Sequence, residues 1–277
     1  MKIGLMLGRI RGRIRSGSSS TAALERIKVT AMFGTVVALT DDLVTKQIID
    51  FGAHTRPELA FLLSIINPGD RVFDIGAHIG TFAIPIARKV GSEGRVLAIE
   101  GDALIFGLLV ENITDNGLTN VITAWQSLIA PADSAFRPTF VPKNSAATYF
   151  LAEEGPYSIP QYTIDELATK TFRPDVIKID IEGLEAWALG GSSIVAERKP
   201  ILYVEVSDSQ LARYGATSAD LEKILRRFGY RLFCNDGPRN ASNDNFRVRE
   251  LHTFVDEGGL FDVLAVPHGS PRLGRLI

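Results

Sequence analysis

The sequence predicts an α/β fold built on a doubly wound, mostly parallel sheet of seven strands that ends in an antiparallel hairpin. Two observations predict it. From residue 70 onward, short apolar runs alternate with helical patterns of about 10–15 residues, which indicates βαβ units with right-handed crossovers. The last two apolar runs have no helical pattern between them, so we expect them to pair antiparallel. The expected strands are residues 72–75, 96–100, 121–129, 175–180, 201–206, 230–234 and 261–266.

The segments that connect these strands are expected to be mainly helical. Helical patterns cover residues 81–90, 104–112, 184–197 and 219–228. Residues 131–160 differ because they carry five prolines, so we expect a loop with a short hairpin there.

Four segments are expected along the chain. Residues 1–22 form a basic tail, for which a mobile, solvated terminus is favoured over a weak contact with a membrane surface. Residues 23–69 form a hairpin and a helix that pack on the core. Residues 70–268 form the main domain, and residues 269–277 form a C-terminal tail.

Within residues 23–69, the alternation of β-branched residues over 29–49 predicts a hairpin that turns at Asp41 and Asp42. The next helix is expected to begin with a capping box made by Thr55 and Glu58, and the turn residues at 67–69 are expected to end it.

Composition excludes several classes of protein. The 277 residues contain 30 Lys+Arg and 32 Asp+Glu, a formal charge of −2, so there is no overall basic footprint for nucleic acid. With 45% hydrophobic residues the chain is not disordered, and its single cysteine excludes an internal disulfide framework and a cysteine-cluster metal site. Apolar runs are far shorter than the ~18 residues of a membrane helix. We therefore expect a soluble, cytoplasmic protein.

The turn after the first sheet strand carries the strongest functional signal. In an open parallel sheet, ligands bind beyond the carboxyl ends of the strands. Here V-F-D-I-G-A-H-I-G-T-F runs from a buried strand through two glycines into a helix, which permits close approach of a ligand to bare backbone. The candidate cofactor-binding residues of this turn are Asp74, Gly76, Ala77, His78, Gly80 and Thr81.

The ends of the next two strands add to this site. A carboxylate at Glu100 can accept hydrogen bonds from both hydroxyls of a ribose, which indicates a nucleoside cofactor. Because His78 replaces the middle glycine of the dinucleotide fingerprint, the turn suits a smaller anionic end, such as the methionine carboxylate of S-adenosylmethionine. Gly101, Gln126 and Ser127 are further candidates for cofactor contact.

The motifs at these positions resemble those of a known family. They are D-I-G-A-H-I-G-T-F at 74–82, V-L-A-I-E at 96–100, E-N-I-T-D-N-G-L-T-N-V at 111–121, T-I-D-E-L at 163–167, V-I-K-I-D-I-E-G-L-E at 176–185 and K-P-I-L-Y-V-E-V at 199–206. Together they resemble the FkbM-type methyltransferases over roughly residues 42–267. His78 and Gly101 depart from the asparagine and proline that are usual in that family.

The resemblance implies the Rossmann-like sheet of class I methyltransferases, S-adenosylmethionine as cofactor, and residues 70–268 as the methyltransferase domain. It also implies methyl transfer to an oxygen of a carbohydrate, glycolipid or polyketide-like acceptor. We expect residues 130–160 and the N-terminal hairpin to form the acceptor-facing wall, since loops over a fixed scaffold set specificity. The expected partner is a small or carbohydrate-like acceptor, not nucleic acid.

Two acids at the end of the fourth strand are the candidate catalytic residues. Asp180 and Glu182 flank Ile181 beside an apolar strand, where their charges need a partner or a cationic ligand. They would line the site near the sulfonium or act as base on the attacking hydroxyl. The alternatives are structural: Asp180 bonding loop amides, and Glu182 capping the helix that follows. His78 is another possible base.

Other roles near this strand are left open. Lys178 shares a strand face with Asp180 and is expected to pair with an acid, whereas Glu205 could touch the acceptor or end its strand in solvent. The acids lack a diagnostic metal-ligand spacing, so no metal is predicted. The alternatives for function are an NAD-dependent oxidoreductase of Rossmann type and a non-catalytic nucleoside-binding module.

Overall fold

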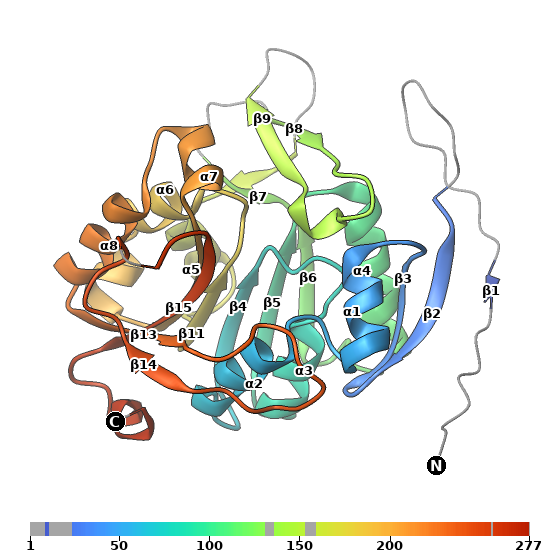
Figure 1. Cartoon of the computed structure of the whole chain (residues 1–277), viewed down its shortest axis with the longest axis horizontal. Helices are drawn as coiled ribbons and strands as arrows, with labels where there is room; N and C mark the ends of the chain where they lie inside the picture. The colour runs from blue at the N-terminus through green and yellow to red at the C-terminus, as the bar shows by residue number, and fades with distance from the viewer. Residues whose placement is uncertain (1–8, 11–23, 131–135, 153–158, 256, 277) are drawn as a thin grey trace.

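The computed structural model describes residues 9–10, 24–130, 136–152, 159–255 and 257–276 (Figure 1). Its largest sheet has the strand order β14-β13-β15-β12-β11-β4-β5-β6. The strands are β4 (Arg71–Ile75), β5 (Arg95–Glu100), β6 (Ile122–Gln126), β11 (Val176–Ile179), β12 (Ile201–Ser207), β13 (Tyr230–Asn235), β14 (Val248–Glu250) and β15 (Leu260–Pro267). The strands β6, β5, β4, β11 and β12 pair in parallel, while β15 lies antiparallel between β12 and β13. The predicted doubly wound sheet with an antiparallel end is confirmed.

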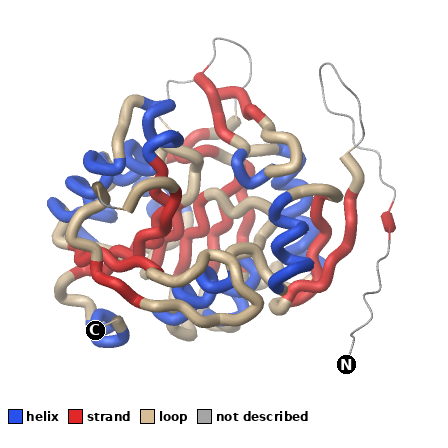
Figure 2. Tube along the Cα trace, viewed as in Figure 1, coloured by secondary structure: helices blue, strands red, loops and turns tan. Residues whose placement is uncertain are grey.

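Helices cover both faces of this sheet (Figure 2). One apolar core packs α2 (Arg56–Ile65), α3 (Ala83–Val90) and α4 (Ala103–Asp115) on one face. A second core packs α5 (Ile164–Lys170), α6 (Glu185–Gly190) and α8 (Ser218–Arg227) on the other. The short α7 (Asp208–Leu211) follows β12. Short helical turns are η1 (Ser145–Ala147), η2 (Ile194–Arg198), η3 (Ala212–Tyr214) and η4 (Pro271–Arg275).

The sequence did not predict every strand. The edge strand β14 adds an eighth member to the sheet, and its three half-buried residues are too few to show a periodic pattern. The expected strand 121–129 is interrupted at Ser127, after which β7 (Leu128–Ile129) pairs with β10 (Gln161–Tyr162). The insertion at 131–160 contains the expected hairpin, formed by β8 (Phe136–Thr139) and β9 (Tyr149–Ala152).

A hairpin is present in the N-terminal segment, but the predicted position of its turn, at Asp41 and Asp42, is wrong. The strands β2 (Arg26–Ala31) and β3 (Gly34–Leu39) are joined at residues 32–33, and α1 (Leu43–Phe51) follows. Asp42 does not turn a hairpin but begins this helix, because its carboxylate accepts a hydrogen bond from Val44 N at 3.0 Å. Of the expected basic tail, only β1 (Arg9–Ile10) is described, paired with β2; the rest lies outside the described residues.

The expected capping box at the start of α2 is also wrong. Thr55 has a left-handed backbone (φ 40°) and makes no capping hydrogen bond. The Glu58 side chain is instead buried against the sheet, where it accepts hydrogen bonds from Tyr203 Oη at 2.9 Å and Asn235 Nδ2 at 3.0 Å. These two bonds fix α2 to β12 and β13.

The buried Glu58 makes stability depend on pH. Burial, together with the nearby Asp262, raises the pKa of Glu58 to about 7 from 4.5. Between these two values the folded chain binds more protons at Glu58 than the unfolded chain, so this residue destabilises the fold as the pH rises. We expect the free energy of unfolding of the wild type, relative to Glu58→Gln, to fall by on the order of 2 kcal/mol from pH 5 to pH 8. Urea unfolding of both proteins from pH 5 to pH 8 would measure this fall. A difference between the two proteins that stays constant with pH would contradict the raised pKa of Glu58.

Within the described residues, no helix is both long and apolar enough to cross a membrane. The C-terminal turn η4 is held to the main domain, because the Arg272 guanidinium contacts the Asp70 carboxylate at 2.6 Å.

Candidate cofactor and catalytic site

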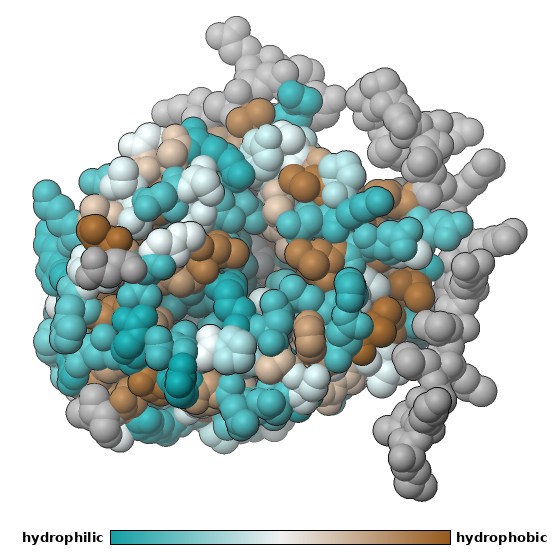
Figure 3. All heavy atoms as spheres, in the orientation of Figure 1, coloured by the Kyte–Doolittle hydropathy of each residue, from teal (hydrophilic) through white to brown (hydrophobic). Residues whose placement is uncertain are grey.

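A cavity opens at the carboxyl ends of β4, β5 and β11, and Figure 3 shows that the molecular surface is hollowed near the centre of the view. The predicted site residues in its wall are Gly76, Ala77, His78, Thr81, Glu100, Gly101, Ser127, Asp180 and Glu182. Asp74, Gly80 and Gln126 lie next to these residues in the chain but do not line the cavity.

The turn after β4 brings two strand ends into contact. Gly76 has φ +80°, and a Cβ there would lie 1.7 Å from the carbonyl oxygen of Asp180. The N–H groups of Gly76 and Ala77 both donate to Ile99 O, at 2.9 and 2.8 Å. Gly76 is therefore needed for protein-to-protein packing at this point, a reason that the sequence did not reveal.

The three predicted residues that do not line the cavity make contacts within the protein. Asp74 is fully buried, with Lys178 Nζ at 3.4 Å, and burial raises the pKa of its carboxyl to about 6. A Cβ on Gly80 would lie 3.1 Å from Leu109 Cδ1, so this glycine serves helix packing. Gln126 is the last residue of β6 and pairs in register with Glu100.

Glu100 is fixed by two backbone donors. Its Oε2 accepts a hydrogen bond from His78 N at 2.9 Å, and its Oε1 accepts one from Asp102 N at 2.8 Å. Each oxygen keeps a further lone pair for a ligand. Burial raises the pKa of Glu100 to about 7. The carboxylate is thus oriented in the cavity wall by the first turn and by the start of α4.

Two polar groups beside Glu100 have unused hydrogen-bonding capacity. The Ser127 hydroxyl and His78 Nδ1 are buried and have no hydrogen-bond partner among the described residues. Buried polar atoms of this kind in a cavity wall are available to hydrogen-bond a ligand or an ordered water. At Gly101 a Cβ would lie 2.3 Å from Leu128 Cδ2 and 2.6 Å from the Phe150 ring, so a larger residue there would displace these two side chains.

His78 connects the first turn to the insertion. Its Nε2 lies 2.8 Å from Ser145 Oγ, and Ser145 N donates to Asp42 Oδ2 at 2.7 Å. Burial lowers the pKa of His78 to about 4, so its ring is neutral at physiological pH. These two contacts join the first turn to the described part of the insertion and to the start of α1.

Asp180 is held as an anion by Lys178. Their Oδ2 and Nζ atoms are 3.3 Å apart, so the expected pairing of Lys178 with an acid is confirmed. Burial alone would raise the pKa of Asp180, but the Lys178 ammonium and hydrogen bonds lower it below its usual value. A carboxylate held ionised in this way is a weak base and a good partner for a positive charge.

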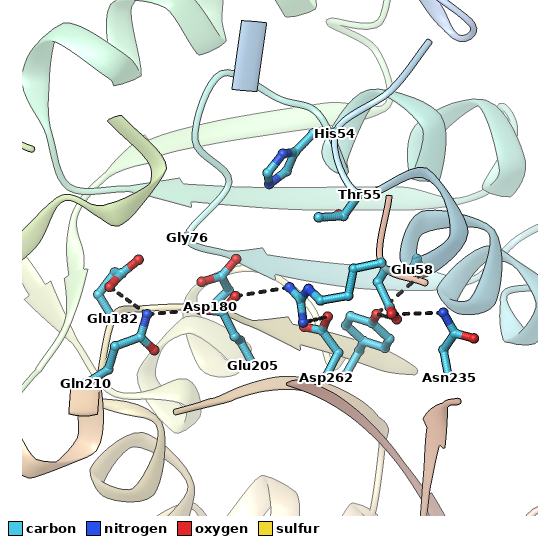
Figure 4. A network of polar contacts seen from close by, with 12 residues as sticks. His54, Thr55, Glu58, Gly76, Asp180, Glu182, Glu205, Gln210, Asn235 and Asp262 are labelled. Carbon is cyan, nitrogen blue, oxygen red and sulfur yellow. Dashed lines mark hydrogen bonds and ion pairs between the residues drawn. The ribbon is translucent and has the colours of Figure 1, made fainter. Parts of the chain in front are cut away.

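Two more acids stand beside Asp180 (Figure 4). Oxygens of Asp180, Glu182 and Glu205 all lie within 4.8 Å of one another. Gln210 Nε2 donates to Glu182 at 2.8 Å and to Glu205 at 3.3 Å, and Arg213 Nη1 is 3.4 Å from Glu182.

Burial and the nearby charge of Asp180 raise the pKa of Glu182 to about 8 and that of Glu205 well above its usual value. Glu182 does not cap the next helix, because α6 begins without a side-chain capping hydrogen bond. Glu205 does not end its strand in solvent, since it is buried and Arg239 Nη2 lies 3.4 Å from it.

Several residues of this region were missed by the sequence analysis. His54 lines the cavity from the loop between α1 and α2, and Ser145 and Phe150 line it from the insertion. None of them follows a strand of the main sheet. The rule that ligands bind beyond the carboxyl ends of parallel strands, which identified the other candidates, therefore could not identify them. Arg239 lies in the polar stretch 235–245. This stretch has no periodic pattern that would indicate the ion pair between Arg239 and Asp262.

Comparison with known proteins gives one family. The model described as "Methyltransferase FkbM domain" matches residues 74–232. The hexuronic acid methyltransferase AglP of Haloferax volcanii is 28% identical over 170 residues, which cover 60% of this chain and 66% of that protein. The 23S rRNA (uracil(1939)-C(5))-methyltransferase RlmD of Acidithiobacillus ferrooxidans is 36% identical over 80 residues, 29% of this chain and 18% of that protein. This chain therefore spans less than two thirds of the length of either relative.

Among solved structures, Aeropyrum pernix fibrillarin in complex with natively bound S-adenosyl-L-methionine is 14% identical. The match covers 95% of this chain and 98% of that chain, with a TM-score of 0.42.

Proposed function

This chain belongs to the methyltransferase FkbM domain family, and we propose that it transfers the methyl group of S-adenosylmethionine to a hydroxyl of a carbohydrate-like acceptor. S-adenosylmethionine is the cofactor, and when bound it supplies an electrophilic methyl group on a positively charged sulfur. The alternative of a nicotinamide-dependent oxidoreductase is wrong, because the family is one of methyltransferases. The labelling experiment below separates an active methyltransferase from the other alternative, a non-catalytic nucleoside-binding module.

The cavity wall fits this cofactor. Glu100 has free lone pairs for a vicinal diol, and the unpartnered Ser127 hydroxyl can bond the base. Thr81 and the backbone that leads into α3 would hold the methionine end. Asp180, kept ionised by Lys178, would face the sulfonium.

The cluster of Asp180, Glu182 and Glu205 carries the proposal for the acceptor. Asp180 and Glu182 line one end of the cavity, and Glu205 and the amide of Gln210 lie beside them, so the cluster offers the many hydrogen-bonding groups that hydroxyl-rich ligands require. At neutral pH Glu182, with a pKa of about 8, is protonated and would donate a hydrogen bond to an acceptor oxygen. We propose a sugar acceptor in preference to nucleic acid, because the formal charge of −2 gives the chain no overall basic footprint for a phosphate backbone.

The related hexuronic acid methyltransferase supports this acceptor class. We also propose that catalysis needs no metal ion. Lys178 contacts Asp180, Gln210 and Arg213 contact Glu182, and Arg239 contacts Glu205, so each acid already has a protein donor.

Methyl transfer from labelled cofactor to a panel of hexuronic acids, neutral saccharides, glycolipids and ribosomal RNA tests the proposal. We expect a saccharide to be labelled, at a rate that EDTA leaves unchanged. Asp180→Asn should lower kcat by roughly 100-fold while binding of S-adenosylhomocysteine stays within about threefold, because a charge aimed at the reacting centre is lost. Asp50→Asn, at an exposed surface ion pair, is the control. Labelling of RNA alone would contradict the proposed acceptor.

A further inference from the structure

His54 is the cavity residue for which the proposed function has no role. It lies in the loop between α1 and α2 and lines the same cavity as Gly76, Lys178 and Asp180. In Figure 4 its ring points toward Asp180 from the opposite side of the site. It therefore stands at the end of the cavity where the reacting groups would meet.

A hydrogen bond fixes which ring nitrogen of His54 carries the proton. Gln47 Oε1 accepts a hydrogen bond from Thr55 N at 3.2 Å, so the amide atom at this place is oxygen. The same oxygen lies 2.7 Å from His54 Nδ1, and two acceptors cannot bond each other. Nδ1 of His54 is therefore the protonated nitrogen, and in the neutral ring Nε2 carries a lone pair.

This lone pair is free for a ligand. Among the described residues, no hydrogen bond to Nε2 is made, and the ring stands in the cavity wall. Burial lowers the pKa of His54 to about 3, the charges of His78, Arg239 and Lys178 act in the same direction, and Asp180 opposes them. The ring is thus neutral at physiological pH, in the form that accepts a proton.

We propose that His54 Nε2 takes the proton of the acceptor hydroxyl and that Gln47 positions the ring for this step. This inference rests on the proposed function. As the oxygen forms its bond to the methyl carbon, the electron pair of the C–S bond leaves with the neutral thioether. The electron pair of the O–H bond stays on the oxygen, and the proton moves to Nε2 and then to solvent.

Asp180 and His54 would then have different tasks. Asp180 is neutralised by Lys178, so it is a poor base, but its negative charge faces the ring that becomes positive. A weakly basic imidazole suffices, because an oxygen that gains a methyl group while it keeps its proton is a far stronger acid than an imidazolium.

His54→Asn tests the proton transfer. The asparagine amide can still donate to Gln47 as Nδ1 does, but it has no counterpart of Nε2. We expect kcat to fall by roughly 100-fold or more, while the Kd of S-adenosylhomocysteine and the acceptor KM stay within about threefold. His54→Ala should regain turnover when imidazole is added. His252→Asn, at an exposed histidine, is the matched control. A His54→Asn enzyme within about threefold of the wild type would overturn the proposal.

A second measurement does not depend on turnover. Nitrogen NMR of the histidine rings in the protein without acceptor should show His54 neutral, with protonated Nδ1 and bare Nε2, from pH 5 to pH 8. Gln47→Leu should mix the two tautomers. A protonated Nε2 in the wild type would overturn the role of His54 even if sugar methylation is observed. Failure of the wild type to label any saccharide would refute the acceptor class, and the NMR result would still decide the tautomer.

Discussion

Glu100→Gln should weaken the binding of S-adenosylhomocysteine by roughly 100-fold. The glutamine removes a charged acceptor from the ribose hydroxyls, and hydrogen bonds to a charged group contribute about 1.5–3 kcal/mol each. It also turns an N–H group toward either His78 N or Asp102 N, both of which need an acceptor. Isothermal titration calorimetry measures the change.

The pH adds a second signature to this prediction. Because burial raises the pKa of Glu100 to about 7, we expect the affinity of the wild type for S-adenosylhomocysteine to rise with pH through this value, as the carboxyl loses its proton. The Glu100→Gln variant should lose this rise. Glu93→Gln, at an exposed glutamate two residues before β5 begins, should bind as the wild type does. Equal affinities of the wild type and Glu100→Gln would contradict a ribose contact at Glu100.

Gly76→Ala should be the most destabilising of these substitutions. The added Cβ would lie 1.7 Å from the carbonyl oxygen of Asp180, and a backbone atom has little freedom to move aside. We expect a loss of more than about 4 kcal/mol of the free energy of unfolding, a value typical of severe overpacking and backbone strain. Thermal and urea unfolding would both detect it.

Gly69→Ala separates the steric clash from the backbone conformation. Gly69 has φ +81°, nearly the same as Gly76, but no atom lies within 4 Å of the place of its Cβ. It should therefore lose only about 1–2 kcal/mol, the cost of a left-handed alanine. If the two variants are equally destabilised, the contact between the turn and the end of β11 is not what requires Gly76.

The main sheet could be predicted because its strands are buried on both faces. Runs such as residues 72–75 and 201–206 are apolar throughout, and polar or glycine-containing segments separate them from helical patterns. The N-terminal segment was harder to predict from the sequence, since an aspartate such as Asp42 is as compatible with the start of a helix as with a turn. Glu58 shows the same ambiguity, because a capping box and a buried bond to Tyr203 require the same side chain.

The candidate site could be predicted only where it follows the sheet. Glu100, Asp180 and the first turn stand at strand ends, and the structure brings them to one cavity. His54 and Ser145 come from a loop and an insertion whose positions depend on tertiary contacts, such as the bond of Ser145 N to Asp42. Gly76 was singled out for close approach to a ligand, whereas the structure shows close approach to Asp180.

We propose that one cavity holds the nucleoside, with Glu100 at its sugar and Asp180 near its sulfur. A crystal structure of the protein with S-adenosylhomocysteine tests it most directly. We predict both ribose hydroxyls within hydrogen-bond distance of the Glu100 carboxylate and the sulfur on the side of Asp180 and His54. A nucleoside bound in another place, or a Glu100 side chain that makes no contact with the ribose, would contradict the account.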